Sequence, residues 1–413
     1  MRAVSILFPI VFALVGTPFC TSQDLVLKNA KIYESPFRPA IEHGTILVRG
    51  KNIAWVGAAR DARLPRGGRV IDCTGMVVTA GFWNSHVHIL TPGLIHADKL
   101  STDETTAQLQ AMFTRWGFTT VFDIASVLKN TNLIRERIAT GRSQGPRILT
   151  TGEPFWIETP IYVQSFFKAN DVHMPETQSI PEAIQRVKMQ VNQSADGIKI
   201  FANSIEDREV LTMPLEMGQA IAAEAHALGK PIFAHVSNNI GIEMALHSGI
   251  DVLAHTTPID RPWTPEFVKP LVAAHMALTP TLTLWEFESR KGGISANDLD
   301  EVMMRAARQL NAFFAAGGDV LFGTDGGYTD IFDTTDEFKW MSRAGMDYEQ
   351  ILASLTTTPA QRFGYSEHTG TIAKGYDADL AVLKDDPAKD PTAFAKVRYT
   401  VRRGKVIYDS ATQ

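Results

Sequence analysis

Short apolar and alternating runs mark both ends of the chain. Near the N-terminus, residues 25–27, 45–48 and 53–56 are such runs, separated by polar turn residues. Near the C-terminus the same pattern returns at residues 380–383, 397–401 and 406–408. We expect these two β-rich pieces, residues 23–79 and 366–413, to pair into one small β-sandwich domain.

Between these pieces, residues 80–365 alternate between strand-like and helix-like patterns. Apolar strand runs are predicted at residues 119–122, 197–201, 231–236, 251–254, 278–284 and 320–323. Strands that are apolar on both faces are typical of a parallel sheet covered by helices. The pattern therefore predicts an α/β protein with a TIM (β/α)8 barrel. A doubly wound open sheet is the alternative, which the lack of a Gly-rich phosphate loop after the first strand disfavours.

The N-terminus has the organisation of a secretory signal. Met1-Arg2 precedes an apolar run from Ile6 to Val15, and small and polar residues follow through Ser22. The pattern predicts a signal peptide over residues 1–22 and an exported protein, periplasmic or secreted. A buried first strand is one alternative. A lipoprotein anchored at Cys20 is another, although residues 17–19 match the required small-residue box poorly.

Composition narrows the class of partner. The 413 residues are 45% hydrophobic and 21% charged, which is too apolar for a disordered chain. A net charge of -5 with scattered Lys and Arg provides no basic surface for nucleic acid. The body contains no apolar stretch long enough for a transmembrane helix. The composition is compatible with a homo-oligomer and does not identify the substrate.

Residue types that bind metals follow several of the predicted strands. His86 and His88 are two positions apart, so a strand places both imidazoles on one face. His235, His255 and Asp325 each close an apolar run. Any one of these residues alone is more typical of a structural role. Because a barrel builds its site at the C-terminal ends of its strands, the ordered set predicts a metal centre.

Lys199 is the unusual member of this set. It lies within the apolar run 197–201, where it is expected to face the barrel interior. Burial of a lone ammonium is costly and lowers its pKa. A neutral amine can add carbon dioxide and become a carbamate (N6-carboxylysine), an anionic oxygen ligand that can bridge two cations. The simpler interpretation of Lys199 alone is an ion-paired lysine.

These residues and their surroundings resemble the amidohydrolase superfamily. The resemblance is carried by the segments 84–88, 117–121, 323–325 and 370–380. Lys199, within Ile198-Lys199-Ile200, is similar to the lysine of the binuclear branch that contains a carboxylated lysine, near its prolidase-like and imidazolonepropionase-like groups. The likeness covers nearly all of the mature chain.

The resemblance implies a centre of two divalent metal ions, for which zinc suits the imidazole and oxygen ligands. His86, His88 and Asp325 would bind one ion, His235 and His255 the other, and carboxylated Lys199 would bridge them. The deaminase branch places a Glu three residues after the third His, where this chain has Asn238. Related groups often carry Gly-Gly-His on the third strand, which the segment 155–162 lacks, so their substrate contacts do not transfer.

The expected reaction is hydrolysis of an amide or peptide bond. A hydroxide shared by the two cations attacks the carbonyl, Asp325 passes its proton to the leaving amine, and His255 steadies the oxyanion. The family likeness points to a dipeptide such as Xaa-Pro, or an N-acyl amino acid, as substrate. A lactone, carbamate or N-acyl toxin hydrolase on the same metals is the alternative. A barrel that binds ligands without turnover is a further one.

A few residues allow both a functional and a structural interpretation. Tyr162 is a candidate contact for the tetrahedral intermediate, or a packed loop aromatic. Arg290, after the seventh strand, is a candidate for holding a substrate carboxylate, or a solvated charge. An acidic cluster after Asp325 either disfavours anionic substrates or begins a solvated helix; it comprises Asp330, Asp333, Asp336 and Glu337. We interpret three histidines on predicted helices as structural, namely His226, His247 and His275.

Overall fold

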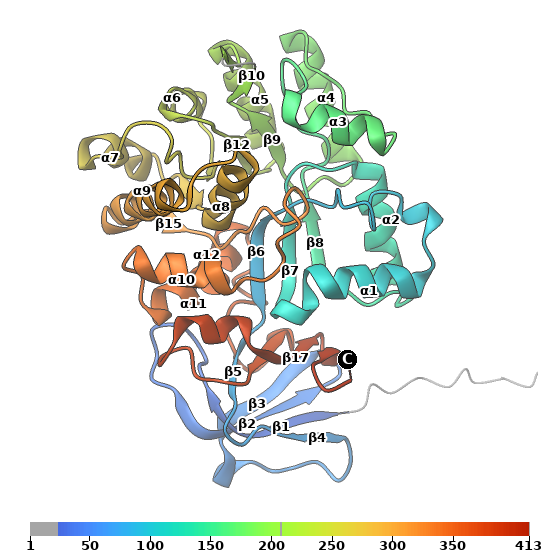
Figure 1. Ribbon diagram of the computed structural model, residues 1–413. Coiled ribbons are helices and arrows are strands. Elements are labelled where there is room, and N and C mark those ends of the chain that lie inside the picture. Colours follow the sequence, from blue (N-terminus) through green and yellow to red (C-terminus); the bar gives the residue numbers. More distant parts are fainter. Residues whose placement is uncertain (1–23, 207–208, 413) are drawn as a thin grey trace, which may run out of the picture.

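The computed structural model describes residues 24–206 and 209–412. A β-sheet lies at one end of the molecule, below a larger body of strands and helices (Figure 1). The predicted signal peptide, residues 1–22, and Cys20 within it lie outside the described residues.

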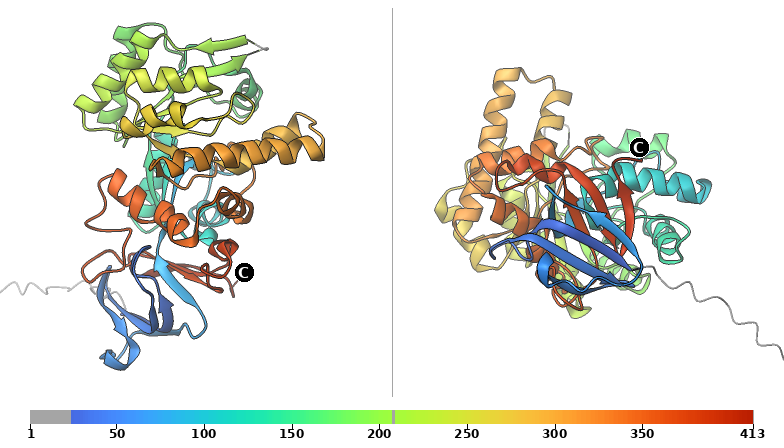
Figure 2. Two further views of the ribbon diagram at one scale, coloured as in Figure 1. Left: turned by 90° about the vertical axis from the view of Figure 1, so that its left-hand side faces the viewer. Right: turned by 90° about the horizontal axis from the view of Figure 1, so that it is seen from below.

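Strands from both chain ends form the sheet at the base. The N-terminal strands are β1 (Leu25–Ile32), β2 (Ile41–Arg49), β3 (Asn52–Ala58), β4 (Arg69–Asp72) and β5 (Val77–Ala80). The C-terminal strands are β16 (Leu380–Leu383), β17 (Val397–Arg402) and β18 (Lys405–Asp409). Seen from below, strands of the two ends run side by side (Figure 2, right).

Strands from the two chain ends pair with each other, as expected, and hydrogen bonds join all of them in one sheet. Its order is β18-β17-β16-β5-β1-β2-β3, with β4 also paired to β1. β5 pairs with β1 on one side and β16 on the other, so it joins the strands of the two ends in one ladder. By hydrogen-bond pairing, the strands of both chain ends form a single eight-stranded sheet, and its packing as a β-sandwich stays a prediction.

Eight parallel strands form the centre of the larger body, in two sheets. One has the order β6-β7-β8 and the other β15-β14-β13-β12-β9. Their bounds are β6 (Phe82–Val87), β7 (Phe118–Asp123), β8 (Arg147–Thr150), β9 (Ile198–Phe201), β12 (Ile232–His235), β13 (Val252–Ala254), β14 (Ala277–Thr279) and β15 (Asp319–Val320). This arrangement confirms the α/β class.

Single bridges connect the two sheets at both junctions. Phe155, beyond β8, pairs in parallel with Ile200 of β9, and Val87 of β6 pairs with Gly326 beyond β15. One apolar cluster contains side chains from strands of both sheets, including Trp83, Phe122 and Phe233. These contacts favour a closed barrel. The closed eight-stranded ladder itself stays a prediction, because the strands pair as two sheets.

Helices surround the central strands (Figure 1). They are α1 (Thr102–Met112), α2 (Leu128–Ala139), α3 (Ile161–Ala169), α4 (Ile180–Asn192), α5 (Leu215–Ala227), α6 (Asn239–Ser248), α7 (Pro265–Ala273), α8 (Leu282–Lys291), α9 (Ala296–Ala315), α10 (Thr335–Arg343), α11 (Tyr348–Leu355) and α12 (Thr357–Arg362). A β-hairpin of β10 (Asn203–Glu206) and β11 (Glu209–Thr212) follows β9. The long helix α9 projects from the body (Figure 2, left). Within the described part of the chain, no helix combines the length and apolarity needed to cross a membrane.

The structure corrects one predicted strand. Residues 278–284 were expected to be extended, but β14 ends at Thr279 and α8 begins at Leu282. Glu337 of α10 accepts hydrogen bonds from the backbone N–H groups of Leu282 and Thr283, both at 2.8 Å. This carboxylate satisfies donors at the start of α8 from 54 or 55 residues away, so local pattern could not reveal the helix.

Candidate metal centre

The six residues predicted as metal ligands line one cavity of about 620 Å³. His86 lies in β6 and His88 just after it; Lys199 lies in β9. His235 is the last residue of β12, His255 follows β13, and Asp325 follows β15 by five residues. Their common position near strand ends brings together residues that are far apart in the chain.

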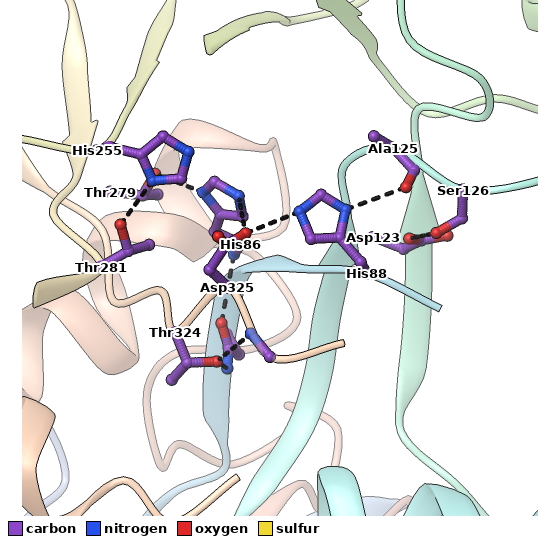
Figure 3. Close-up of polar contacts among 12 residues, drawn as sticks. His86, His88, Asp123, Ala125, Ser126, His255, Thr279, Thr281, Thr324 and Asp325 are labelled. Carbon is purple, nitrogen blue, oxygen red and sulfur yellow. Dashed lines mark hydrogen bonds and ion pairs between the residues drawn. The ribbon is translucent and has the colours of Figure 1, made fainter. Parts of the chain in front are cut away.

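Asp325 is at the centre of the closest group (Figure 3). Its Oδ1 lies 2.8 Å from Nε2 of His86 and 2.8 Å from Nε2 of His88. One ligand atom each of His86, His255 and Asp325 lies within 4.8 Å of the others. The ring centroids of His235 and His255 are 5.0 Å apart, so the fourth imidazole adjoins this group.

Neighbouring oxygens orient the two imidazoles that face Asp325. Nδ1 of His88 lies 3.0 Å from the carbonyl oxygen of Ala125, which can only accept. Nδ1 of His86 lies 3.2 Å from the hydroxyl of Thr279, and that hydroxyl donates to the carbonyl of Leu253. Both Nδ1 atoms are therefore donors, and both Nε2 atoms of the neutral rings carry lone pairs.

This arrangement fits a cation. Two nitrogen lone pairs and a carboxylate oxygen converge at 2.8 Å, where they repel one another unless a positive charge lies among them. Nε2 of His86 is buried and has no hydrogen-bond partner of suitable geometry among the described residues. Imidazole and carboxylate are ligands that Zn²⁺ prefers. The donor set is thus suited to a divalent metal.

Burial favours the neutral form of three of the imidazoles, those of His86, His235 and His255. It lowers the pKa of His86 and of His235 to about 3, and lowers that of His255 well below its ordinary value. Burial alone would raise the pKa of Asp325, but contact with His86 and His88 outweighs it and holds the pKa well below its usual range. Neutral imidazoles and an ionised carboxylate are the protonation states in which these groups bind metals.

Lys199 faces the same cavity from β9. It pairs in register with Phe233, which belongs to the apolar cluster among the central strands, and its side chain is buried. Among the described residues, no hydrogen bond or ion pair reaches its Nζ, which lies 5.9 Å from the ring centroid of Phe201. Burial lowers the pKa of Lys199 to about 7. Burial therefore favours the neutral amine over the ammonium at this position.

A buried carboxylate supports the loop that follows β6. Asp123, at the end of β7, accepts hydrogen bonds from the backbone N–H of Ile89 and from the hydroxyls of Ser126, Thr131 and Thr150. Ile89 directly follows His88 in the chain. Ser126 directly follows Ala125, whose carbonyl oxygen orients the His88 imidazole (Figure 3). Asp123 therefore fixes the backbone next to His88 and the backbone next to Ala125, the two residues that form this contact.

Tight backbone contacts position Asp325. The backbone N–H of Asp325 donates to the carbonyl of His86 at 2.9 Å. Asn84 donates from Nδ2 to the hydroxyl of Thr324 at 2.8 Å. Asp325 and His255 have φ values of 58° and 79°, in the left-handed region that costs non-glycine residues energy and is often found at functional sites.

The weaker candidates are placed differently. Tyr162 lines the cavity. Arg290 lies on α8 and pairs with Glu286 at 2.6 Å; it lines a separate surface depression beside α10. The acidic cluster is also divided: Asp330 is exposed, whereas Glu337 is buried and holds the start of α8. Of the histidines interpreted as structural, His226 lies on α5 and pairs with Asp251, just before β13, at 2.9 Å.

Sequence analysis missed most of the cavity wall. Trp156, Trp285, Tyr328, Asp260 and Glu288 all line it. Tyr328 donates its hydroxyl to Glu288 at 2.7 Å. No periodic pattern marks these residues, because they lie in loops and on α8. The one signal that could have indicated them is their proximity in the sequence to strand ends; Tyr328, for example, lies three residues after Asp325.

Asn238, the residue that separated this chain from the deaminase pattern, has a structural role. Its side chain accepts from the backbone N–H of Gly241 and caps the N-terminus of α6. It also accepts a hydrogen bond from Nδ2 of Asn203 at 2.6 Å. The residue lines the cavity but carries no ionisable group, so no acid or base takes the place of the deaminase Glu at this position.

Comparison with known proteins places this centre in a family. The model of the Amidohydrolase family matches residues 77–407. A dihydroorotase of Lactobacillus gasseri is 24% identical over 392 residues, covering 87% of this chain and 88% of that protein. An ochratoxinase of Aspergillus niger is 26% identical over 230 residues, covering 52% of this chain and 46% of that protein.

A solved structure shares the fold over almost the whole chain. A Xaa-Pro dipeptidase with methionine bound in its active site superimposes with a TM-score of 0.79 at 20% identity, covering 94% of this chain and all of that one. The fold and the donor set define a metal-dependent hydrolase. The chain belongs to the amidohydrolase family.

Proposed function

We propose that this protein hydrolyses an amide or peptide bond of a small substrate with two divalent metal ions, most suitably zinc, bound in the cavity. His86, His88 and Asp325 would hold one ion, and His235 and His255 the other. The observation that carries the proposal is the convergence of two imidazole nitrogens on one carboxylate oxygen, each at 2.8 Å, inside a substrate-sized cavity.

We further propose that Lys199 bridges the ions as a carbamate. A pKa near 7 leaves enough neutral amine to add carbon dioxide, and its Nζ has no competing hydrogen bond or ion pair among the described residues. The neutral amine forms a new N–C bond with carbon dioxide and loses one proton, so the side chain becomes an anionic carbamate. An anion there offsets part of the charge of two cations, which four neutral imidazoles cannot do.

The protein's own groups then account for proton transfer. When bound, the ions would polarise a carbonyl and acidify bound water to a pKa of about 7. Asp325 is ionised at neutral pH, so it can accept a proton and deliver it to the leaving nitrogen. His255, close to His86 and Asp325, would steady negative charge that develops on the substrate oxygen. The buried setting limits the water that competes for these contacts.

The substrate panel follows from the comparisons. Dipeptides such as Xaa-Pro, and N-acyl amino acids, are the first candidates, because a Xaa-Pro dipeptidase shares the fold. A lactone, carbamate or N-acyl toxin hydrolase is the second candidate, which the apolar residues along the cavity wall favour. The relative named as an ochratoxinase adds to that second candidate.

Metal content and turnover test the proposal together. Purified protein is loaded with Zn²⁺ in the presence of bicarbonate and assayed with dipeptides, N-acyl amino acids, esters, lactones and carbamates. We expect about two zinc ions per chain and cleavage of an amide substrate. Cleavage of esters or lactones alone would select the second candidate. Zinc binding without turnover of any compound would leave a non-catalytic binding protein and contradict the proposal.

Asp325→Asn tests the proton-transfer role. We expect turnover to fall by about 10²–10⁴-fold, the usual contribution of general acid–base catalysis, with part of the zinc retained. Asp330→Asn, at an exposed position five residues away, is the matched control and should keep wild-type turnover. A near-normal kcat in Asp325→Asn would exclude this role.

We also propose that the protein is exported through a signal over residues 1–22. The apolar run from Ile6 to Val15 behind Arg2 supports this. N-terminal sequencing of the natural protein should begin near residue 23. A natural protein that begins at Met1 would contradict export by cleavage.

A further inference from the structure

The cavity that holds the candidate metal centre continues as an apolar channel to the surface. We propose that the substrate carries a large, uncharged apolar group next to its scissile bond, and that this group extends from the metal centre to an aliphatic rim at the mouth. The inference rests on the proposed function and specifies its substrate. We call Ile205, Ile259 and Ile294 the aliphatic rim.

The apolar wall begins at a metal-ligand candidate. The ring of Phe201 stacks on that of His235 with centroids 4.5 Å apart and planes 18° from parallel. Trp156 packs against two aromatic rings, with centroid distances of 5.2 Å to Phe201 and 6.0 Å to Phe167. Trp156 and Phe167 belong to a buried apolar cluster, and all three aromatic residues line the cavity. A group next to the reacting carbonyl therefore meets aromatic surface at once.

The outer end of the cavity is also apolar, although solvent can reach it. Ile205, Ile259 and Ile294 line the cavity and are 47%, 62% and 37% exposed. They come from three separate segments: β10, the loop after β13 and the loop between α8 and α9. An apolar group that covers such side chains gains about 25 cal/mol for each Å² removed from water.

The charges on the wall disfavour an anionic group. Outside the proposed ligand set, the charged lining residues in the described part of the chain are Asp260 and Glu288. Asp260 accepts from the backbone N–H of Asn239 at 2.7 Å, and Glu288 accepts from Tyr328. Both carboxylates repel a negative substituent, whereas they do not oppose an uncharged chain.

The cavity volume agrees with this substrate class. About 620 Å³ lies within the range of roughly 300–1,000 Å³ typical of sites for drug-sized ligands. A two-residue zwitterion would leave the aliphatic rim in water. An N-acyl compound with a long or aromatic acyl group would fill the channel and cover the rim.

A chain-length series tests the inference. Zinc-loaded wild-type protein is assayed with the acetyl, butanoyl and octanoyl amides of 4-nitroaniline, which share one scissile bond. Each buried methylene contributes about 0.8 kcal/mol, so six additional ones should raise kcat/KM at least about 100-fold from acetyl to octanoyl. An octanoyl analogue ending in a carboxylate should lose most of this gain.

Rim variants locate the effect. Ile259→Ser and Ile294→Ser should each lower the ratio of octanoyl to acetyl kcat/KM by about 5-fold or more. Ile240→Ser is the matched control, because Ile240 is 52% exposed on α6 and does not line the cavity. This control should keep the wild-type ratio.

Binding of a neutral apolar fluorophore, N-phenyl-1-naphthylamine, separates the two proposals. If the acetyl and octanoyl amides are cleaved equally well and the rim variants keep the ratio, the inference is wrong and the proposed function stands. If no amide is cleaved but the fluorophore binds and octanoyl amide displaces it, the proposed function is wrong and the apolar channel stands. Neither cleavage nor binding would overturn both.

Discussion

The hydroxyl of Thr279 decides which nitrogen of His86 carries its proton. It accepts from Nδ1 of His86 at 3.2 Å because its own proton is directed to the carbonyl of Leu253. Nε2 is thereby left with a lone pair that points toward the Asp325 carboxylate. The Thr279 hydroxyl, which is not itself a candidate ligand, thus orients the candidate ligand His86.

Thr279→Val keeps the shape of this side chain and removes the acceptor. We expect zinc affinity to fall about 10–100-fold, the usual effect of losing such a partner. Competition with a chromogenic chelator measures it. Thr79→Val, at a buried threonine of β5 in the basal sheet, is the control and should bind zinc normally. Equal zinc affinity in both variants would show that Thr279 does not orient His86.

Gly327 permits the close approach of two chain segments at the centre. Its φ is +105°, and an added Cβ would lie 1.8 Å from the carbonyl oxygen of His88. Backbone cannot yield as a flexible side chain does, so Gly327→Ala must move His88 or Asp325.

We expect Gly327→Ala to lose zinc binding and to unfold at a lower denaturant concentration. Gly364→Ala is the matched control, since Gly364 also has a positive φ (+78°) but open space around it. The control should lose only about 1–2 kcal/mol of stability from backbone strain and should keep its zinc. Zinc titration and urea unfolding of both variants provide the comparison, and normal zinc binding by Gly327→Ala would contradict the clash.

At the scale of elements, α8 depends on a carboxylate from α10. Glu337 is fully buried and accepts from the backbone N–H groups of Leu282 and Thr283 and from the Thr283 hydroxyl at 2.9 Å. α8 supplies Leu284, Trp285 and Glu288 to the cavity wall. The contact therefore links a helix start to the shape of the site.

The pH dependence of this contact has a definite sign. Burial raises the pKa of Glu337 from an ordinary value of 4.5 to about 7, although its hydrogen-bond donors favour the ionised form and oppose the rise. The folded state therefore binds this proton more tightly than the unfolded state. The contribution to stability is full below pH 4.5 and is lost as the pH rises toward 7.

Urea unfolding of metal-free protein between pH 4.5 and 7.5 tests this sign. Relative to Glu337→Gln, the unfolding free energy of wild type should fall with rising pH, by at most about 1.4 kcal/mol per pH unit. Glu301→Gln, on the exposed face of α9, is the control and should follow wild type. A difference between wild type and Glu337→Gln that is constant across the range would contradict a raised pKa.

At the scale of the whole molecule, the basal sheet depends on both chain ends. β16 pairs with β5 along four residues, and Leu380 and Val382 share an apolar cluster with Leu27 and Ile46 of the N-terminal strands. Buried side chains of β17 and the adjoining segment, such as Val397 and Phe394, pack into the core of the larger body. Neither end can complete this core alone.

A chain ending at residue 379 should therefore fail to fold, because it exposes the edge of β5 and the apolar side chains that β16 and β17 cover. We expect it in the insoluble fraction without zinc binding. A chain ending at residue 409, which keeps β16, β17 and β18, is the control and should be soluble and active. A soluble, zinc-binding protein ending at 379 would show that the larger body folds independently.

The order of residues was enough to predict most of the central strands and the residue types of the candidate metal centre. Apolar runs and strand periodicity are local, so β9, β12 and β13, with the histidines at the ends of β12 and β13, could be predicted directly from the order of residues. The spacing of His86 and His88 placed two imidazoles on one face. The alternation of strand and helix patterns correctly predicted the α/β class.

The contacts that assemble the candidate site could be seen only in the tertiary structure. The approach of Asp325 to two imidazoles, the acceptor for Nδ1 of His86, the burial of Glu337, and the aromatic wall around Trp156 all depend on contacts between residues tens to hundreds of positions apart. The same holds for Arg290, whose side chain pairs on α8 away from the cavity. Periodicity carries no information about such contacts, because they arise only when separate strands pack together.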